Sequence, residues 1–316
     1  MPTILYVAAG EKSEAWRDAF AAQLPEAEFR VWSADPAADE TGDKAEIDYV
    51  LAWKPQPGLL KTFPNLKAIL SLGAGVDHLF LDPELPRAVP VVRLFDRCLT
   101  QGMSEYAIYW VIHFHRKMGV YAQFARDHVW KQMRQADAER RRVGILGLGE
   151  LGGDAARKLV PLHYQVAGWS RSKKEIPGVE SFHGQDQLIP FLNRTEILVC
   201  LLPLTPDTQG IINKETLAAL PKGAYFINCA RGGHVVDDDL LAALDSGHIE
   251  GATLDVFHEE PLPADHPYWA HPKVNVTPHM ASLTVPESST EWYVRNIRLM
   301  ESGEPPLNTV DFDTRY

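Results

Sequence analysis

Short apolar runs alternate with amphipathic stretches along the N-terminal third of the chain. The apolar runs have the length of buried strands, and the amphipathic stretch has the spacing of a surface helix. The predicted helix covers Ser13 to Leu24, and the predicted strands cover Thr3 to Val7, Phe29 to Trp32, Tyr49 to Trp53, Ala68 to Leu72 and Pro90 to Leu94. Strands separated by helices indicate a parallel sheet with helices on both faces.

The same alternation returns in the C-terminal half. Strands are predicted at Val143 to Leu146, Val166 to Trp169, Ile197 to Leu201, Ala224 to Asn228, Ala252 to Asp255 and Val274 to Thr277. Helices are predicted at Lys214 to Leu220 and at Asp237 to Ser246, where Asp237 is a plausible N-cap. Six strands in this order indicate a complete doubly wound dinucleotide-binding domain.

A long apolar helix is predicted to begin at Ser104 and to run to about Val120. Its apolar residues need burial on more than one side, so it can join two domains, form a subunit interface, or do both. A final helix from about Pro286 to Ser302 can return to the first sheet. A chain of 316 residues suits two domains, predicted as 1–99 with 287–316 and as 100–286.

Three glycines follow the strand that begins at Val143. Gly147, Gly149 and Gly152 have the spacing G-x-G-x-x-G at the start of a predicted helix. Such glycines allow a tight turn, close approach of a pyrophosphate, and close packing of helix on strand, while the helix N-terminus favours phosphate. The same spacing also occurs in plain turns, but the strands on either side favour a dinucleotide site.

A second glycine-containing loop, Ser71 to Asp77, lies between a predicted strand and a predicted helix start. Its main-chain N–H groups can hold a carboxylate, as the later loop can hold phosphate. The alternative is a glycine-rich turn that binds nothing.

Composition narrows the function and the location. A formal charge of −11 argues against broad nucleic-acid binding. The scattered cysteines Cys98, Cys200 and Cys229 suit a reducing compartment. The first residues lack the pattern of a signal peptide, and no apolar run is long enough to span a bilayer, so we expect a cytoplasmic protein with no membrane partner.

Three chemically capable side chains follow strands of the second half: Arg231, Glu260 and His279. Ligands of open α/β sheets bind beyond the carboxyl ends of the strands, so these side chains can converge on one crevice. Taken singly, they have simpler explanations: a surface cap, a solvated acid and a buried histidine.

Several motifs in one order resemble the D-isomer-specific 2-hydroxyacid dehydrogenase family, and most closely its glyoxylate/hydroxypyruvate reductase branch. The motifs span essentially the whole chain: G-x-G-x-x-G at 147–152, LPLTP at 202–206, NCARG at 228–232, DVF at 255–257, EPL at 260–262 and PH at 278–279. The resemblance implies an α/β chain of two doubly wound parallel-sheet domains, a Rossmann dinucleotide-binding domain and a smaller flavodoxin-like substrate domain.

The resemblance also makes Arg231, Glu260 and His279 the catalytic set. The planar guanidinium of Arg231 can hold the carboxylate and carbonyl oxygens of a 2-oxo acid. His279 can give a proton to the oxygen on which reduction leaves negative charge. Glu260 would orient the imidazole and favour its protonated form. His258 and His271 do not match the motif positions.

The same resemblance implies further contacts. Substrate contacts are expected from Gly73, Ala74, Gly75 and Val76 as well as from Arg231 and His279. Trp53 and Leu99 are candidate pocket walls, with core packing as the alternative. Asp255 is expected near the nicotinamide carboxamide, with a strand-end cap as its alternative. The expected cofactor-binding residues are Gly147, Gly149, Glu150, Leu151, Gly152, Ser170, Arg171, Ser172, Leu202, Pro203, Cys229, Ala230 and Asp255.

The end of the second strand of the dinucleotide domain bears on the choice of nicotinamide. NAD-binding domains usually have an acidic residue there for the ribose hydroxyls, but Ser170 occupies the place. Arg171, with Lys173 or Lys174, can meet the 2′-phosphate of NADP. NADPH is therefore the expected preference, NAD stays possible, and no metal is expected. The alternative is a solvated basic loop.

The leading hypothesis is a cytoplasmic, NADPH-dependent reductase of small 2-oxo acids, converting glyoxylate to glycolate and hydroxypyruvate to D-glycerate. Alternatives are a dehydrogenase of a bulkier 2-oxo acid and a nucleotide-sensing interaction protein on the same scaffold. Family analogy and the long apolar helix suggest a homodimer. Trp130 can reach the neighbouring subunit's site, although local packing is the simpler role for it.

Overall fold

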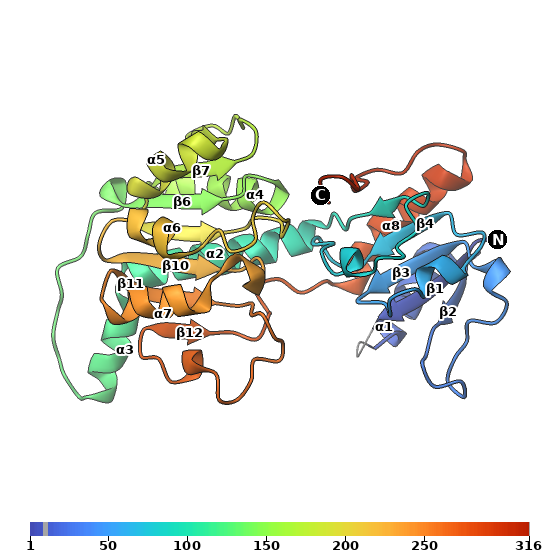
Figure 1. Ribbon diagram of the computed structural model, residues 1–316, viewed down its shortest axis with the longest axis horizontal. Helices are drawn as coiled ribbons and strands as arrows, with labels where there is room; N and C mark the ends of the chain where they lie inside the picture. The colour runs from blue at the N-terminus through green and yellow to red at the C-terminus, as the bar shows by residue number, and fades with distance from the viewer. Residues whose placement is uncertain (9–11, 316) are drawn as a thin grey trace. The chain divides into compact units, whose positions relative to one another are not determined.

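The computed structural model describes residues 1–8 and 12–315, and contact density divides them into two compact units (Figure 1). The first unit comprises Met1–Leu99 and Thr284–Tyr316, and the second comprises Thr100–Leu283. The sequence prediction places the second boundary after residue 286, and the contact division places it after residue 283. Each unit contains its own parallel sheet, so each can be described by itself.

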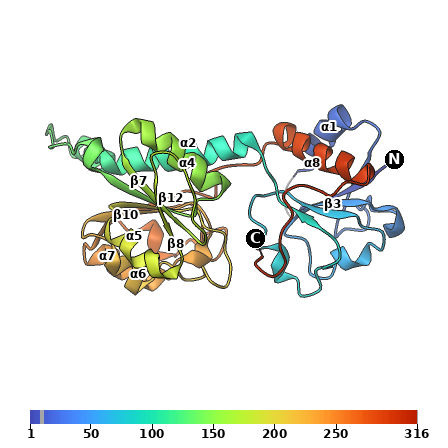
Figure 2. The ribbon, with the colours of Figure 1, turned by 90° about the horizontal axis from the view of Figure 1, so that it is seen from above.

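The first unit has five parallel strands in the order β2-β1-β3-β4-β5, which is the flavodoxin-like order. The strands are β1 (Thr3–Ala8), β2 (Glu28–Val31), β3 (Tyr49–Trp53), β4 (Ala68–Ser71) and β5 (Val91–Val92). Helices α1 (Glu14–Gln23) and α8 (Pro286–Glu301) cover one face (Figure 2). Trp16 of α1 and Tyr293 of α8 pack there, with ring centroids 6.0 Å apart.

The other face of this sheet is covered differently from the prediction. Its core includes Leu60 and Leu79, which belong to three-residue 3-10 helices rather than α-helices. The α-helix expected after Ser71 to Asp77 is therefore wrong, because only the turn Leu79–Leu81 forms there. Asp82 precedes Pro83 and has an extended backbone, as residues before proline do, so the turn cannot continue.

The second unit has seven parallel strands in the order β12-β11-β10-β9-β6-β7-β8. The strands are β6 (Arg142–Leu146), β7 (Gln165–Ser170), β8 (Glu180–His183), β9 (Ile197–Cys200), β10 (Ala224–Asn228), β11 (Ile249–Leu254) and β12 (Val274–Val276). This is the doubly wound Rossmann order with one strand added at an edge. The prediction of six strands missed β8, an edge strand with Phe182 as its only strongly apolar residue.

Helices pack on both faces of the second sheet (Figure 2). One face carries α2 (Arg97–His115) and α4 (Glu150–Leu159), and the other carries α5 (Leu188–Asn193), α6 (Lys214–Ala219) and α7 (Asp237–Asp245). Two buried clusters correspond to these faces, since Ile145 lies in one and Leu146 in the other. Within residues 1–8 and 12–315, no helix has the length and apolar character needed to cross a bilayer.

The predicted long helix is wrong at both ends. It begins at Arg97 rather than Ser104, because Asp96 Oδ1 accepts hydrogen bonds from the N–H groups of Cys98 and Leu99 at 2.5 and 3.2 Å. It stops at His115, where Lys117 adopts a left-handed conformation with φ of 56°. A separate helix, α3 (Met118–Arg126), then follows.

The predicted N-cap of α7 is also wrong. Val236 occupies the cap position, and Asp237 is the first residue of the helix. The Asp237 Oδ1 atom instead accepts a hydrogen bond from the Tyr268 hydroxyl at 2.9 Å. The carboxylate that the sequence pattern assigned to the helix end is therefore bonded to a residue distant in the sequence.

Candidate active site

The glycine turn after β6 leaves no room for side chains. Gly147 has φ of +98°, and a Cβ atom there would lie 2.6 Å from the Leu201 carbonyl oxygen. A Cβ at Gly152 would lie 1.8 Å from the Gly147 carbonyl oxygen, so α4 packs directly on the turn. Gly149 is the N-cap of α4 and provides no side-chain cap for the first-turn N–H groups. These features fit a bound dinucleotide pyrophosphate.

The end of β7 has a basic rather than an acidic environment. Ser170 is buried, and its hydroxyl donates to the carbonyl oxygen of Ser172 at 2.8 Å. Arg171 is exposed directly beside it. The Lys173 Nζ atom lies 3.7 Å from Glu175 Oε1. A guanidinium at this position suits a phosphate group on the adenosine ribose.

The loops after β9 and β10 contain the remaining residues expected at the cofactor. Cys229 and Ala230 are buried immediately before Arg231, and burial raises the pKa of the Cys229 thiol. Leu202 is also buried, and Pro203 is half-buried. A thiol that stays protonated is an apolar wall rather than a nucleophile.

The loop of Arg231 packs against the loop that holds Glu260. A Cβ atom at Gly232 would lie 2.0 Å from the carbonyl carbon of Phe257, so the two main chains are in direct contact. The Arg231 Nη1 atom donates to the carbonyl oxygen of Ala230 at 2.7 Å. Asn228, the last residue of β10, donates through Nδ2 to the carbonyl oxygen of Arg231 at 2.9 Å.

Glu260 and His279 form a hydrogen-bonded pair. His279 Nδ1 lies 2.8 Å from Glu260 Oε2, and the N–H of Phe257 donates to Glu260 Oε1 at 3.0 Å. The side chains of His279 and Glu260 are 35% and 23% exposed. A carboxylate at Nδ1 requires a proton on that nitrogen, so Nε2 is the nitrogen that can exchange a proton with a substrate.

Asp255 organises the turn that carries His279. Its main-chain carbonyl accepts the N–H of His279 at 2.8 Å, and its side chain, in a residue only 1% exposed, accepts the N–H groups of Met280 and Ala281, both at 2.9 Å. His279 itself has φ of +51°, a left-handed backbone that needs such support. The observed bonds are those of a strand-end cap, the alternative stated for Asp255.

Two hydroxyl groups extend this support to helix α2. Thr277 Oγ1 donates to Asp255 Oδ1 at 2.6 Å and lies 2.7 Å from the Tyr106 hydroxyl. Because the Thr277 hydroxyl already donates its proton to Asp255, the Tyr106 hydroxyl is the donor to Thr277 Oγ1. Burial raises the pKa of Tyr106, which keeps its hydroxyl protonated. The sequence analysis missed Tyr106, because its apolar surroundings in α2 resemble ordinary core.

The first-unit residues that are predicted to contact the substrate lie close to one another. The indole ring of Trp53 lies over Gly73, where a Cβ atom would be 2.7 Å from Trp53 Cζ3. The Trp53 ring centroid is 4.4 Å from that of His78. Ala74 and Gly75 are half-buried, whereas Val76 and Leu99 are buried at 4% and 6% exposure. For Leu99, this burial agrees with the core-packing alternative.

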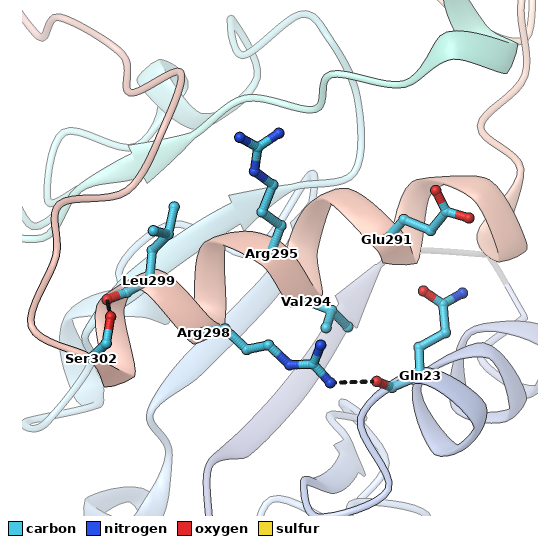
Figure 3. A pocket seen from close by; sticks show the side chains of 7 residues that line it. All are labelled: Gln23, Glu291, Val294, Arg295, Arg298, Leu299 and Ser302. Carbon is cyan, nitrogen blue, oxygen red and sulfur yellow. Dashed lines mark hydrogen bonds between the residues drawn. The ribbon is translucent and has the colours of Figure 1, made fainter.

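A surface groove of about 580 Å³ lies elsewhere in the first unit (Figure 3). Its wall is formed by α1 and α8, and Arg298 donates across it to the carbonyl oxygen of Gln23 at 3.2 Å. The lining residues are Gln23, Glu291, Val294, Arg295, Arg298, Leu299 and Ser302. None of the residues expected at the cofactor or the substrate lines this groove.

A dinucleotide turn and a carboxylate–imidazole pair on one Rossmann sheet define a nicotinamide-dependent dehydrogenase. Residues 108–281 match the family described as D-isomer specific 2-hydroxyacid dehydrogenase, NAD binding domain. The chain belongs to this D-isomer-specific 2-hydroxyacid dehydrogenase family, and its curated relatives place it in the glyoxylate/hydroxypyruvate reductase branch. The expected fold class is confirmed as well.

Individual relatives resemble the chain over nearly its whole length. Glyoxylate/hydroxypyruvate reductase A of Serratia proteamaculans is 41% identical over 305 residues, covering 95% of each chain. A D-isomer specific 2-hydroxyacid dehydrogenase from Xanthobacter autotrophicus, in complex with NADPH and MES, has a TM-score of 0.96 and 43% identity, covering 100% of this chain and 99% of the other. An NADPH-dependent glyoxylate/hydroxypyruvate reductase from Sinorhizobium meliloti, in complex with NADP and sulfate, has a TM-score of 0.92 and 40% identity, covering 100% of both.

Proposed function

We propose that the protein reduces small 2-oxo acids with NADPH, converting glyoxylate to glycolate and hydroxypyruvate to D-glycerate. The observation that carries the proposal is the hydrogen bond of 2.8 Å between Glu260 and His279 on the sheet that also bears the glycine turn. The names of the Serratia and Sinorhizobium relatives support the choice of substrates.

The proposed mechanism assigns one task to each side chain. When bound, the reduced nicotinamide supplies the hydride. Arg231 holds the carboxylate and carbonyl oxygens of the 2-oxo acid in its planar fork. His279 Nε2 donates a proton to the oxygen that becomes the hydroxyl group. Glu260 stabilises the imidazolium and keeps the ring oriented, and oxidation reverses these steps.

The proposed preference for NADPH rests on the end of β7. Ser170, which is buried, stands where an acid would repel a 2′-phosphate, and Arg171 is exposed beside it. Three solved relatives are described with NADPH or NADP bound. In the proposal, the first turn of α4 and the loops at Leu202 and Cys229 complete the cofactor site.

We also propose a cytoplasmic homodimer. Large apolar side chains are exposed around α2 and α3, including Tyr109 at 58%, Met118 at 48% and Trp130 at 99%. Such a set is typical of a surface covered by another subunit, and Trp130 can reach the partner's site. Light scattering should therefore give about twice the chain mass of 35.3 kDa.

The decisive experiment is a panel of 2-oxo acids tested with both NADPH and NADH, followed at 340 nm. We expect turnover of glyoxylate and hydroxypyruvate and a higher kcat/KM with NADPH. Faster turnover of larger 2-oxo acids would favour a dehydrogenase of bulkier substrates. NADPH binding without turnover of any 2-oxo acid in the panel would overturn the proposed reductase activity. It would favour a nucleotide-sensing protein.

A further inference from the structure

The loop after β9 and the loop after β10 are joined by one buried imidazole. His234 is 0% exposed; its Nδ1 atom lies 3.1 Å from the carbonyl oxygen of Arg231, and its Nε2 atom lies 3.2 Å from the carbonyl oxygen of Pro203. We propose that His234 is a positioning residue that fixes the Arg231 loop relative to the Pro203 loop. This inference rests on the proposed function, which assigns Arg231 to the substrate and Pro203 to the cofactor.

The chemistry of the two partners supports this role. Carbonyl oxygens accept but cannot donate, so a ring nitrogen bonds to one of them only as N–H. A neutral ring has one N–H and donates to one of the two carbonyl oxygens, whereas an imidazolium donates to both. A rigid planar ring with one nitrogen directed at each loop sets the separation of the two carbonyl groups. The side chain therefore acts as a spacer as well as a hydrogen-bond donor.

Each of the two carbonyl oxygens also has a donor on its own side. Asn228 Nδ2, at the end of β10, donates to the Arg231 carbonyl oxygen at 2.9 Å. Thr208 Oγ1 donates to the Pro203 carbonyl oxygen at 2.6 Å from within its own loop. Main-chain bonds join the two loops farther along, from the Gly210 N–H to the Gly233 carbonyl oxygen at 2.9 Å and from the Ile212 N–H to the His234 carbonyl oxygen at 2.8 Å. The imidazole contacts both loops at Arg231 and Pro203, so removing it loosens their relative placement at that end.

The main chain at His234 is held without its side chain. The Ile212 N–H donates to the His234 carbonyl oxygen at 2.8 Å, and the Val236 N–H donates to the Ile212 carbonyl oxygen at 2.8 Å. Variants that change only the side chain therefore keep these main-chain hydrogen bonds. The imidazole is the part of His234 whose removal affects the two loops.

His234→Phe removes the ring N–H while keeping a planar ring, and His234→Gln keeps one amide donor group. His248→Gln is the matched control, because His248 Nε2 also meets a carbonyl oxygen, that of Leu217 at 2.9 Å, away from the predicted site residues. For H234F we expect kcat/KM for glyoxylate to fall about tenfold, equivalent to about 1.4 kcal/mol for the lost link between the loops. H234Q should lose about threefold, and H248Q should keep wild-type constants.

Three measurements test the inference together: kcat, KM for glyoxylate, and the NADPH dissociation constant by fluorescence, each well below the unfolding temperature. The H234F variant should raise both KM and the NADPH dissociation constant, whereas a loss of stability alone would change only the unfolding temperature. Wild-type constants in both His234 variants would overturn the inference. If H234F does not fold, H234Q decides alone by the same criterion. If the wild type binds NADPH without turnover, the proposed function fails, and the dissociation constants of the variants still test the role of His234.

Discussion

Replacing Glu260 by Gln tests the central pair most directly. The carboxylate accepts from His279 Nδ1 through Oε2 and from the Phe257 N–H through Oε1. Glutamine has the same shape but only one oxygen, which can take the place of Oε1 or of Oε2 but not of both. With Phe257 retaining that oxygen, the amide N–H₂ faces Nδ1, and the support for the imidazolium is lost.

The size of the effect follows from the geometry. A hydrogen bond to a charged group contributes about 1.5–3 kcal/mol. The side chains of His279 and Glu260 are 35% and 23% exposed, which screens the charges and favours the lower limit. About 1.4 kcal/mol corresponds to a factor of ten in rate. Proton transfer needs the ring held in place, so kcat/KM for glyoxylate should fall about tenfold in the E260Q variant.

The assay is kcat/KM for glyoxylate with saturating NADPH at one fixed pH. Glu259→Gln is the matched control, since Glu259 is the exposed neighbouring carboxylate. Thermal unfolding of both variants separates a loss of stability from an effect on the ring. A wild-type kcat/KM in a folded variant that binds NADPH normally would refute the role of Glu260.

Three further results are expected. Arg171→Ala should raise KM for NADPH at least about tenfold with little change for NADH, because a charge-assisted phosphate contact is lost; equal effects on both cofactors would contradict the assignment. Thr277→Val should lower kcat about tenfold at an unchanged NADPH dissociation constant, since the support of the His279 turn by Asp255 and Tyr106 is interrupted; a wild-type kcat would exclude that support. Trp130→Ala should raise KM for larger 2-oxo acids if this residue, 99% exposed, reaches the partner's site, and an unchanged KM profile would count against it.

Local periodicity predicted the two sheets because their strands are short, apolar and buried. The Ala224–Asn228 strand and the Lys214–Ala219 helix appear where the pattern placed them, apart from one terminal residue. The pattern was weakest where burial is partial, as in the edge strand Glu180–His183, whose residues are half-buried or exposed. Hydrophobic spacing carries little information at an edge, because one side of the strand faces solvent.

Helix ends were predicted less well, since tertiary contacts decide them. The carboxylate of Asp96 caps α2 and also accepts hydrogen bonds from Ser288 and Ser289. The carboxylate of Asp237 accepts a hydrogen bond from the Tyr268 hydroxyl instead of capping its own helix. A sequence shows which residues are capable of capping, but the competing partners are far away along the chain.

The motifs predict which residues carry the chemistry, and the structure shows the contacts around Glu260 and His279. Glu260 and His279 are separated along the chain, yet they pair because the turn after β12 wraps around the buried Asp255 carboxylate. The left-handed backbone of His279 directs the imidazole, and the bonds that hold this backbone come from main-chain groups and from Asp255. The orientation of the Glu260–His279 pair therefore depends on Asp255, which acts through the main chain of the turn. For the same reason, variants that loosen the turn should impair the reaction even when all three proposed catalytic side chains are present.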